Sequence, residues 1–115
     1  MARAILLAAL LLAAPAPAEE PLPSFRIEMK DGVVTPRRLE VPAGVAFKIE
    51  IVNSGATPAE FESLRMRKEK VLSPGAESFV TVRRLSPGDY PFFEEFHLEM
   101  DSAHGLIVAK ENEGQ

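Results

Sequence analysis

The sequence predicts an all-β protein, a single two-sheet antiparallel sandwich of seven or eight short strands. Apolar and polar residues alternate in several segments, most regularly at residues 25–29 and 45–51, and this is the period of a strand with one buried face. Gly and Pro turns separate the segments at short intervals, as at residues 42–44 and 73–75. No stretch shows a sustained 3.6-residue apolar period, so helices are not expected. Short strands divided by such turns are typical of a sandwich.

Each expected strand follows from its own pattern. In the first, Phe25, Ile27 and Met29 alternate with charged residues, and Asp31-Gly32 ends it. The most regular strand places Val45, Phe47, Ile49 and Ile51 on one face and ends at residues 53–55. The later strand at 79–85 is expected to turn Val80 and Val82 inward. The remaining strands are expected at 39–41, 60–66, 71–72, 89–93 and 106–108.

The N-terminus predicts an exported protein. A short positive start precedes an uncharged apolar run at residues 4–14, and Ala16-Pro17-Ala18 is a signal-peptidase pattern. We expect a signal peptide at 1–18 cleaved after Ala18, a linker at 19–23, the domain at 24–110 and a disordered tail at 111–115. The apolar run is shorter than the roughly 20 residues that cross a bilayer, so no stable membrane anchor is expected. The alternative is an uncleaved N-terminal anchor.

Composition limits the chemistry. The chain contains no cysteine, which excludes thiolate redox relays, Cys-rich zinc sites and type 1 copper. Its net charge of −4 argues against nucleic acid and anionic lipid as partners, because both need a concentrated basic surface. A basic run at residues 65–70 is interpreted as a charged, solvated strand edge.

Several motifs then occur in a fixed order: Val41-Pro42-Ala43-Gly44, NSGATPAEFE at 53–62, Ser73-Pro74-Gly75, SPGDYPFF at 86–93 and GLIV at 105–108. In this order the chain resembles the EfeO-type cupredoxin-like domain, the small periplasmic cupredoxins associated with ferrous-iron uptake. The resemblance implies a Greek-key sandwich with a metal site at one end, made by the strand after Asn53 and the loop between the last two strands. It also implies a periplasmic location, copper or iron as the bound ion, and an inner-membrane iron permease and a periplasmic iron-binding protein as partners.

The ligand positions depart from those of electron-transfer cupredoxins. Ala59 stands where these proteins have a histidine, and Glu94 stands where they have the cysteine. His97 matches the second ligand histidine, and Met100 lies in the loop of the axial methionine. Without a thiolate, no blue copper site is expected.

The candidate metal ligands are His97 first, with Glu94, Glu60 and Met100, followed by Glu62 and Glu95. Imidazole, carboxylate and thioether together suit copper, and the carboxylates equally suit iron. The competing interpretations are a solvated polar loop around His97 and a pair of water-facing carboxylates at Glu60 and Glu62.

The predicted function is therefore a metal-binding accessory protein for iron or copper handling. A copper-assisted ferroxidase role stays open, as does a non-metal interaction module docking on a membrane permease or periplasmic partner. Nothing arranges Ser, His and Asp as a catalytic triad, so no catalytic residue is assigned.

Overall fold

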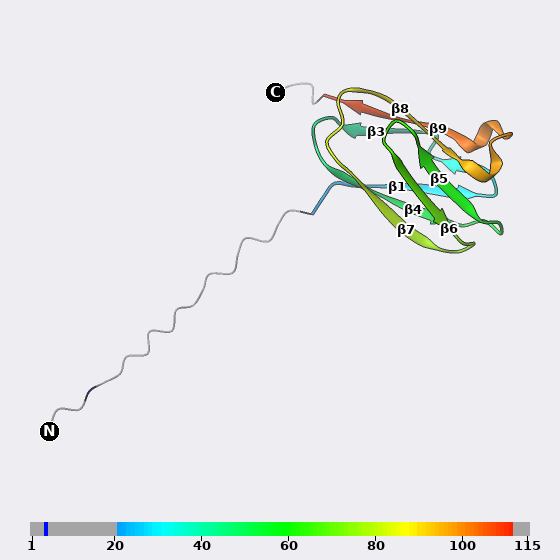
Figure 1. Ribbon diagram of the computed structural model, residues 1–115, viewed down its shortest axis with the longest axis horizontal. Coiled ribbons are helices and arrows are strands. Elements are labelled where there is room, and N and C mark those ends of the chain that lie inside the picture. Colours follow the sequence, from blue (N-terminus) through cyan, green and yellow to red (C-terminus); the bar gives the residue numbers. More distant parts are fainter. Residues whose placement is uncertain (1–3, 5–20, 112–115) are drawn as a thin grey trace.

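The computed structural model describes residue 4 and residues 21–111, and the latter form a β-sandwich (Figure 1). The expected all-β sandwich is confirmed. Three of the predictions for the chain ends lie outside the described residues. They are the signal peptide (except residue 4), the cleavage site after Ala18, and residues 112–115 of the tail. The strands are β1 (Ser24–Lys30), β2 (Val33–Thr35), β3 (Arg38–Pro42), β4 (Phe47–Asn53), β5 (Ala59–Ser63), β6 (Lys68–Leu72), β7 (Glu77–Val82), β8 (Gly88–Glu94) and β9 (His104–Lys110). Two short 3-10 turns, η1 (Glu95–His97) and η2 (Asp101–Ala103), join β8 to β9.

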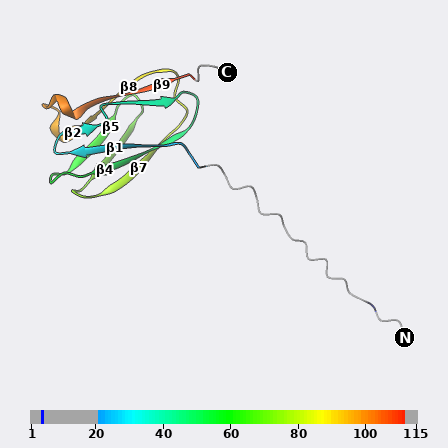
Figure 2. The ribbon, with the colours of Figure 1, turned by 180° about the vertical axis from the view of Figure 1, so that it is seen from behind.

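The strands form two mixed sheets. One sheet has the order β2-β1-β4-β7, and the other has the order β3-β9-β8-β5-β6. Figure 2 shows the ribbon turned by 180° from the view of Figure 1, with β1, β2, β4 and β7 labelled. Most neighbours are antiparallel, as expected, but β1 pairs with β4 and β3 pairs with β9 in parallel. The sequence pattern did not predict these two pairings, because alternation assigns the faces of a strand and not its partners. In the part of the chain that is described, no helix is long and apolar enough to cross a membrane.

The core lies between the two sheets and contains the predicted residues. Phe47, Ile49 and Ile51 of β4 are fully buried, as are Ile27 and Met29 of β1. Val80 and Val82 of β7 and Met66 are also buried. The predicted inward faces of these strands are therefore confirmed.

The predicted strand ends differ from the observed ones where alternation continues into a turn. Val45 is 41% exposed because β4 begins only at Phe47, after a turn in which Gly44 has a φ of +73°. Likewise β5 ends at Ser63, and the turn that follows leaves Leu64 exposed. The basic run at residues 65–70 is predicted to be a charged strand edge, and β6, which includes Lys68 and Lys70, is indeed an edge strand of its sheet.

A candidate metal centre at the β8–β9 loop

Strand β8 ends in a carboxylate, that of Glu94, which lies in the interior of the sandwich. Its inward-facing side chains are Tyr90, Phe92 and finally Glu94, which is fully buried. A buried carboxylate is costly unless hydrogen bonds replace its lost hydration. Glu94 Oε1 accepts hydrogen bonds from the backbone N–H groups of Glu60 (2.9 Å) and Phe96 (3.1 Å). Glu94 is therefore held by η1, which follows its own strand, and by the neighbouring β5.

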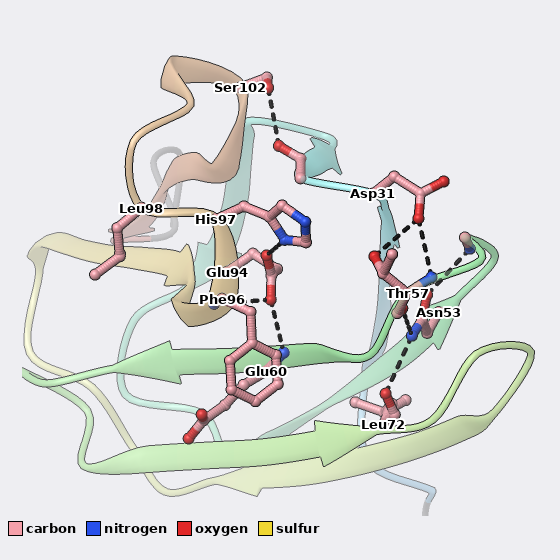
Figure 3. A network of polar contacts seen from close by, with 12 residues as sticks. Asp31, Asn53, Thr57, Glu60, Leu72, Glu94, Phe96, His97, Leu98 and Ser102 are labelled. Carbon is pink, nitrogen blue, oxygen red and sulfur yellow. Dashed lines mark hydrogen bonds and ion pairs between the residues drawn. The ribbon is translucent and has the colours of Figure 1, made fainter.

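The second oxygen of Glu94 meets His97. Glu94 Oε2 contacts His97 Nδ1 directly, as Figure 3 shows. Glu94 is also the N-cap of η1, whose tight turn brings the imidazole three residues later back over the carboxylate. The His97 side chain remains 21% exposed. The structure thus brings together two of the predicted ligands, one buried and one reachable from solvent.

Met100 lies against the same turn of the chain as His97. A Cβ atom added to Gly32 would overlap Met100 Sδ and would lie 3.1 Å from His97 Cβ. Gly32 also has a φ of +86°, a conformation that favours glycine. Its carbonyl accepts a hydrogen bond from Ser102 Oγ (2.8 Å), which ties the β8–β9 loop to the β1–β2 turn. Gly32 therefore allows this turn to pack beside both the imidazole and the thioether.

The loop before β5 is fixed by two polar side chains (Figure 3). The buried Asn53 donates through Nδ2 to the carbonyls of Thr57 (2.9 Å) and Leu72 (3.1 Å). Asp31 Oδ1 accepts from the Thr57 hydroxyl and from the N–H groups of Ala56 and Thr57. The Thr57 hydroxyl, followed by the Ala56 N–H, holds the pKa of Asp31 below its ordinary value. These hydrogen bonds hold the loop before β5 in place at the end of the sandwich that carries the Glu94–His97 pair.

The other predicted carboxylates lie on the opposite face of the same sheet. Glu60 and Glu62 alternate with the buried residues of β5 and so face outward. The Glu60 side chain points away from Glu94 in Figure 3, although the Glu60 N–H binds Glu94. Carboxylate oxygens of Glu60, Glu62 and Glu69 lie within 4.8 Å of one another. The predicted ligands thus divide into an inner group (Glu94, His97, Met100) and an outer group (Glu60, Glu62 and the nearby Glu95).

Two of the outer carboxylates, Glu60 and Glu62, have raised pKa values. Partial burial is the largest cause for Glu60, followed by the charges of Glu69 and Glu95. Burial also raises the pKa of Glu62, and the charge of Glu95 adds to it. A raised folded-state pKa means that the native protein binds the proton more tightly than the unfolded chain. The stability contributed by these groups is present below the ordinary glutamate range and is lost as pH rises through the raised pKa.

Replacing Glu60 by Gln should therefore raise the melting temperature at pH 7 and leave it nearly unchanged at pH 4. Glutamine removes the cost of partly burying a charged carboxylate and also the repulsion from Glu69 and Glu95, and both act only when the carboxylates are charged. Thermal melts of the Glu60→Gln variant and of an exposed control, Glu77→Gln, at the two pH values would measure this. A stability change of equal size at both pH values would contradict the assignment of a charge penalty to Glu60.

Comparison with known proteins identifies the family of this chain and shows which solved structures share its fold. Residues 2–109 match the family model described as the cupredoxin-like domain, so the chain belongs to the cupredoxin-like domain family. The chain is also 33% identical, over 86 residues, to the uncharacterized protein RP394 of Rickettsia prowazekii (strain Madrid E). That alignment covers 75% of this chain and 67% of the relative.

Solved structures show the same fold at low sequence identity. Dithionite-reduced auracyanin from Roseiflexus castenholzii is 15% identical, with a TM-score of 0.65, and the match covers 79% of this chain and 99% of auracyanin. Auracyanin B is 14% identical, with a TM-score of 0.68, and 80% and 91% of the two chains are covered. A purple cupredoxin from Nitrosopumilus maritimus is 18% identical, with a TM-score of 0.55 and coverage of 75% and 99%.

Three residues of this region were missing from the sequence-based candidates. Gly32 was interpreted only as a turn residue, and its close approach to Met100 depends on how the β1–β2 turn folds against a distant loop. Asp31 likewise joins residues far away in the sequence. Glu69 lies opposite Glu62 across the β5–β6 hairpin. It was not a candidate because it lies between basic residues in the sequence. The register of that hairpin would have placed it beside Glu62.

Proposed function

We propose that this chain is an exported, periplasmic metal-binding accessory protein for copper or iron handling. The observation that supports this most directly is the fully buried Glu94 carboxylate in contact with the half-buried His97 imidazole. Desolvated carboxylates are rare in protein interiors unless they pair with a charge or coordinate a metal. Glu94 Oε2 and His97 Nδ1 converge, so the pair can share either a proton or a metal ion.

The available donors fit a transition-metal ion other than type 1 copper. Imidazole nitrogen and carboxylate oxygen suit Cu(II) and iron, and the thioether of Met100 suits Cu(I). The chain has no cysteine, and a carboxylate occupies the inward position at the end of β8. We therefore propose a site without a thiolate and without the intense blue colour that a thiolate gives to Cu(II).

The protein's own contribution is the preorganisation of the donors. Two backbone N–H groups orient the Glu94 carboxylate, and η1 turns His97 toward it. Gly32 allows Met100 to lie beside His97. A bound copper ion would supply one-electron redox chemistry, and an iron ion would be cargo. In this proposal the outer carboxylates of Glu60, Glu62 and Glu95 attract cations to this end of the sandwich and serve as weaker ligands.

The decisive experiment is calorimetric titration of His97→Ala with Cu²⁺ and with Fe²⁺ under anaerobic conditions. Loss of the imidazole should lower Cu²⁺ affinity by at least about tenfold, since it removes the strongest neutral donor of the set. Protons compete with metal for an imidazole, so the affinity of the parent protein should also fall between pH 7.5 and pH 5.5.

His104→Ala is the matched control. The Nε2 atom of His104 interacts with the Leu98 carbonyl (2.8 Å), outside the Glu94–His97 contact, so this variant should bind as the parent does. If Glu60→Gln weakens binding more than His97→Ala, the ion sits on the outer carboxylates and iron becomes the better assignment. If none of these variants changes the titration, the metal-binding proposal is wrong.

One observation favours a docking function beside metal binding. Phe96 and Leu98, which flank His97, are 48% and 44% exposed. Together with the acidic groups around them, they offer an apolar contact next to the candidate centre. In the proposed role this surface meets the iron permease or the periplasmic iron-binding protein that receives the ion. The same surface would remain as an interaction module if the titrations showed no metal binding.

A further inference from the structure

A basic groove lies at the end of the sandwich opposite to His97. Strand β5 runs antiparallel to β8 and starts beside Glu94, so the turn that follows β5 lies at the far end. There this turn meets the end of β7 and encloses a groove of about 490 Å³. The groove is lined by Arg65, Met66, Arg67, Lys68, Val82, Arg83, Arg84 and Leu85.

The walls of this groove are charged and its floor is apolar. Five of the lining residues are Arg or Lys, from two segments that are distant in the sequence. Among residues 21–111, none of the five takes part in a salt bridge with a carboxylate. Met66 and Val82 are buried and form apolar surface beneath them. On a chain with a net charge of −4, this is a concentrated positive region.

Part of the groove is held rigidly. The Arg65 guanidinium donates to the carbonyl of Asp89 and stacks 4.2 Å from the centroid of the Tyr90 ring. Tyr90 in turn donates its hydroxyl to the carbonyl of Ser86 (2.8 Å). Arg67 adopts a φ of 56°, which sets the direction of the turn. A preorganised wall loses little conformational entropy when a ligand binds.

We infer that this groove binds an acidic, extended segment of a partner protein. Carboxylates of such a segment would pair with Arg67, Arg83 and Arg84, and an apolar side chain between them would cover Met66 and Val82. A concave site with an apolar floor suits a peptide better than it suits the flat surface of a membrane. The negative charge of the whole chain disfavours long polyanions, whereas a short segment experiences mainly the local field. Because the groove and the Glu94–His97 pair lie at opposite ends, both can be occupied at once.

The test uses a fluorescein-labelled peptide, acetyl-Glu-Leu-Glu-Glu-Leu-Glu-amide, and fluorescence anisotropy at low and physiological salt. The parent protein should bind it saturably and more weakly as salt rises. Arg83→Glu combined with Arg84→Glu should lower the affinity by about tenfold or more, since it replaces two attractive pairs by repulsive ones. The matched control is Arg26→Glu with Lys30→Glu, two exposed basic residues of β1, which changes the net charge equally.

Equal loss of affinity in both double variants would mean that only overall charge matters, and the assignment to this groove would be wrong. Absence of peptide binding by the parent would also overturn it. Two further measurements test the other possible occupants of the groove. Binding to phosphatidylglycerol vesicles tests a membrane, and sedimentation velocity tests a second copy of the chain. If the Arg83→Glu, Arg84→Glu change abolishes vesicle binding or dissociates a dimer while peptide binding is unaffected, the groove serves a membrane or a second copy instead. Thermal melts of each variant confirm that the fold is intact.

Discussion

Replacing Ile49 by Ala should lower the free energy of unfolding by about 2–5 kcal/mol, the usual range for truncating a buried aliphatic side chain. Ile49 is fully buried in the middle of β4, which is itself an inner strand of its sheet, between β1 and β7. Its neighbours across the ladder, Phe25 and Val80, are held by backbone pairing on both sides. The cavity can therefore collapse only partly, and the lost contacts are not replaced. Urea unfolding followed by circular dichroism would measure the difference.

Val71→Ala is the control for this prediction. Val71 also lies in a strand, but it is 60% exposed on the edge strand β6, and surface substitutions usually change stability by about 0.5 kcal/mol or less. A loss below about 1 kcal/mol for Ile49→Ala would mean that the interior around β4 is not packed as described. The contrast between the two variants tests the inward face of β4 and not the general effect of removing methyl groups from strands.

Replacing Glu94 by Ala should be comparably destabilising, by about 2–5 kcal/mol, although Glu94 is not part of the apolar core. The truncation removes the acceptor of two backbone N–H groups, those of Glu60 and Phe96. It also leaves His97 without its partner and opens a space at the end of β8. A donor that is shielded from water, even in part, costs stability when it loses its acceptor.

Glu94→Gln separates the structural part of this effect from the charge. Glutamine keeps one oxygen for the two N–H groups, so most of the stability should return while the negative charge stays absent. Glu95→Ala, at the neighbouring outward position, should have little effect on stability. If Glu94→Ala unfolds in the same urea range as the parent, water must replace the carboxylate at no cost. The Glu94 side chain would then not organise this end of the sandwich.

The sequence predicted the parts of the fold that depend on local patterning. Alternation identified the inward faces of β1, β4 and β7, and the turn residues separated the strands. The parallel partners of β1 and β3 were not predictable, because pairing between distant strands is decided by how the whole chain packs. Strand ends were also imprecise, as at Val45, since an apolar residue in a turn continues the alternation without being buried.

For the candidate centre, the sequence predicted the loop and the two residues that meet. Glu94 follows Tyr90 and Phe92 at inward positions of one strand, so its burial follows from the period of two. That Glu60 would face away from Glu94 also follows from alternation along β5, once β5 and β8 are known to be neighbours. The sequence pattern could not predict that β5 and β8 are neighbours. It also could not predict the role of Gly32, because that role depends on how the β1–β2 turn packs against the β8–β9 loop.

The parallel pairing of β3 with β9 has a consequence for the rate of folding. It joins residues 38–42 to residues 106–110, so strands β4 to β8 all lie in the loop that this contact closes. Contacts between distant segments slow folding, since the entropy of loop closure is lost before the contacts form; all-β domains of this kind fold in about milliseconds to seconds. Strand β9 lies between β3 and β8, so the sheet that carries Glu94 is complete only after the last strand has docked.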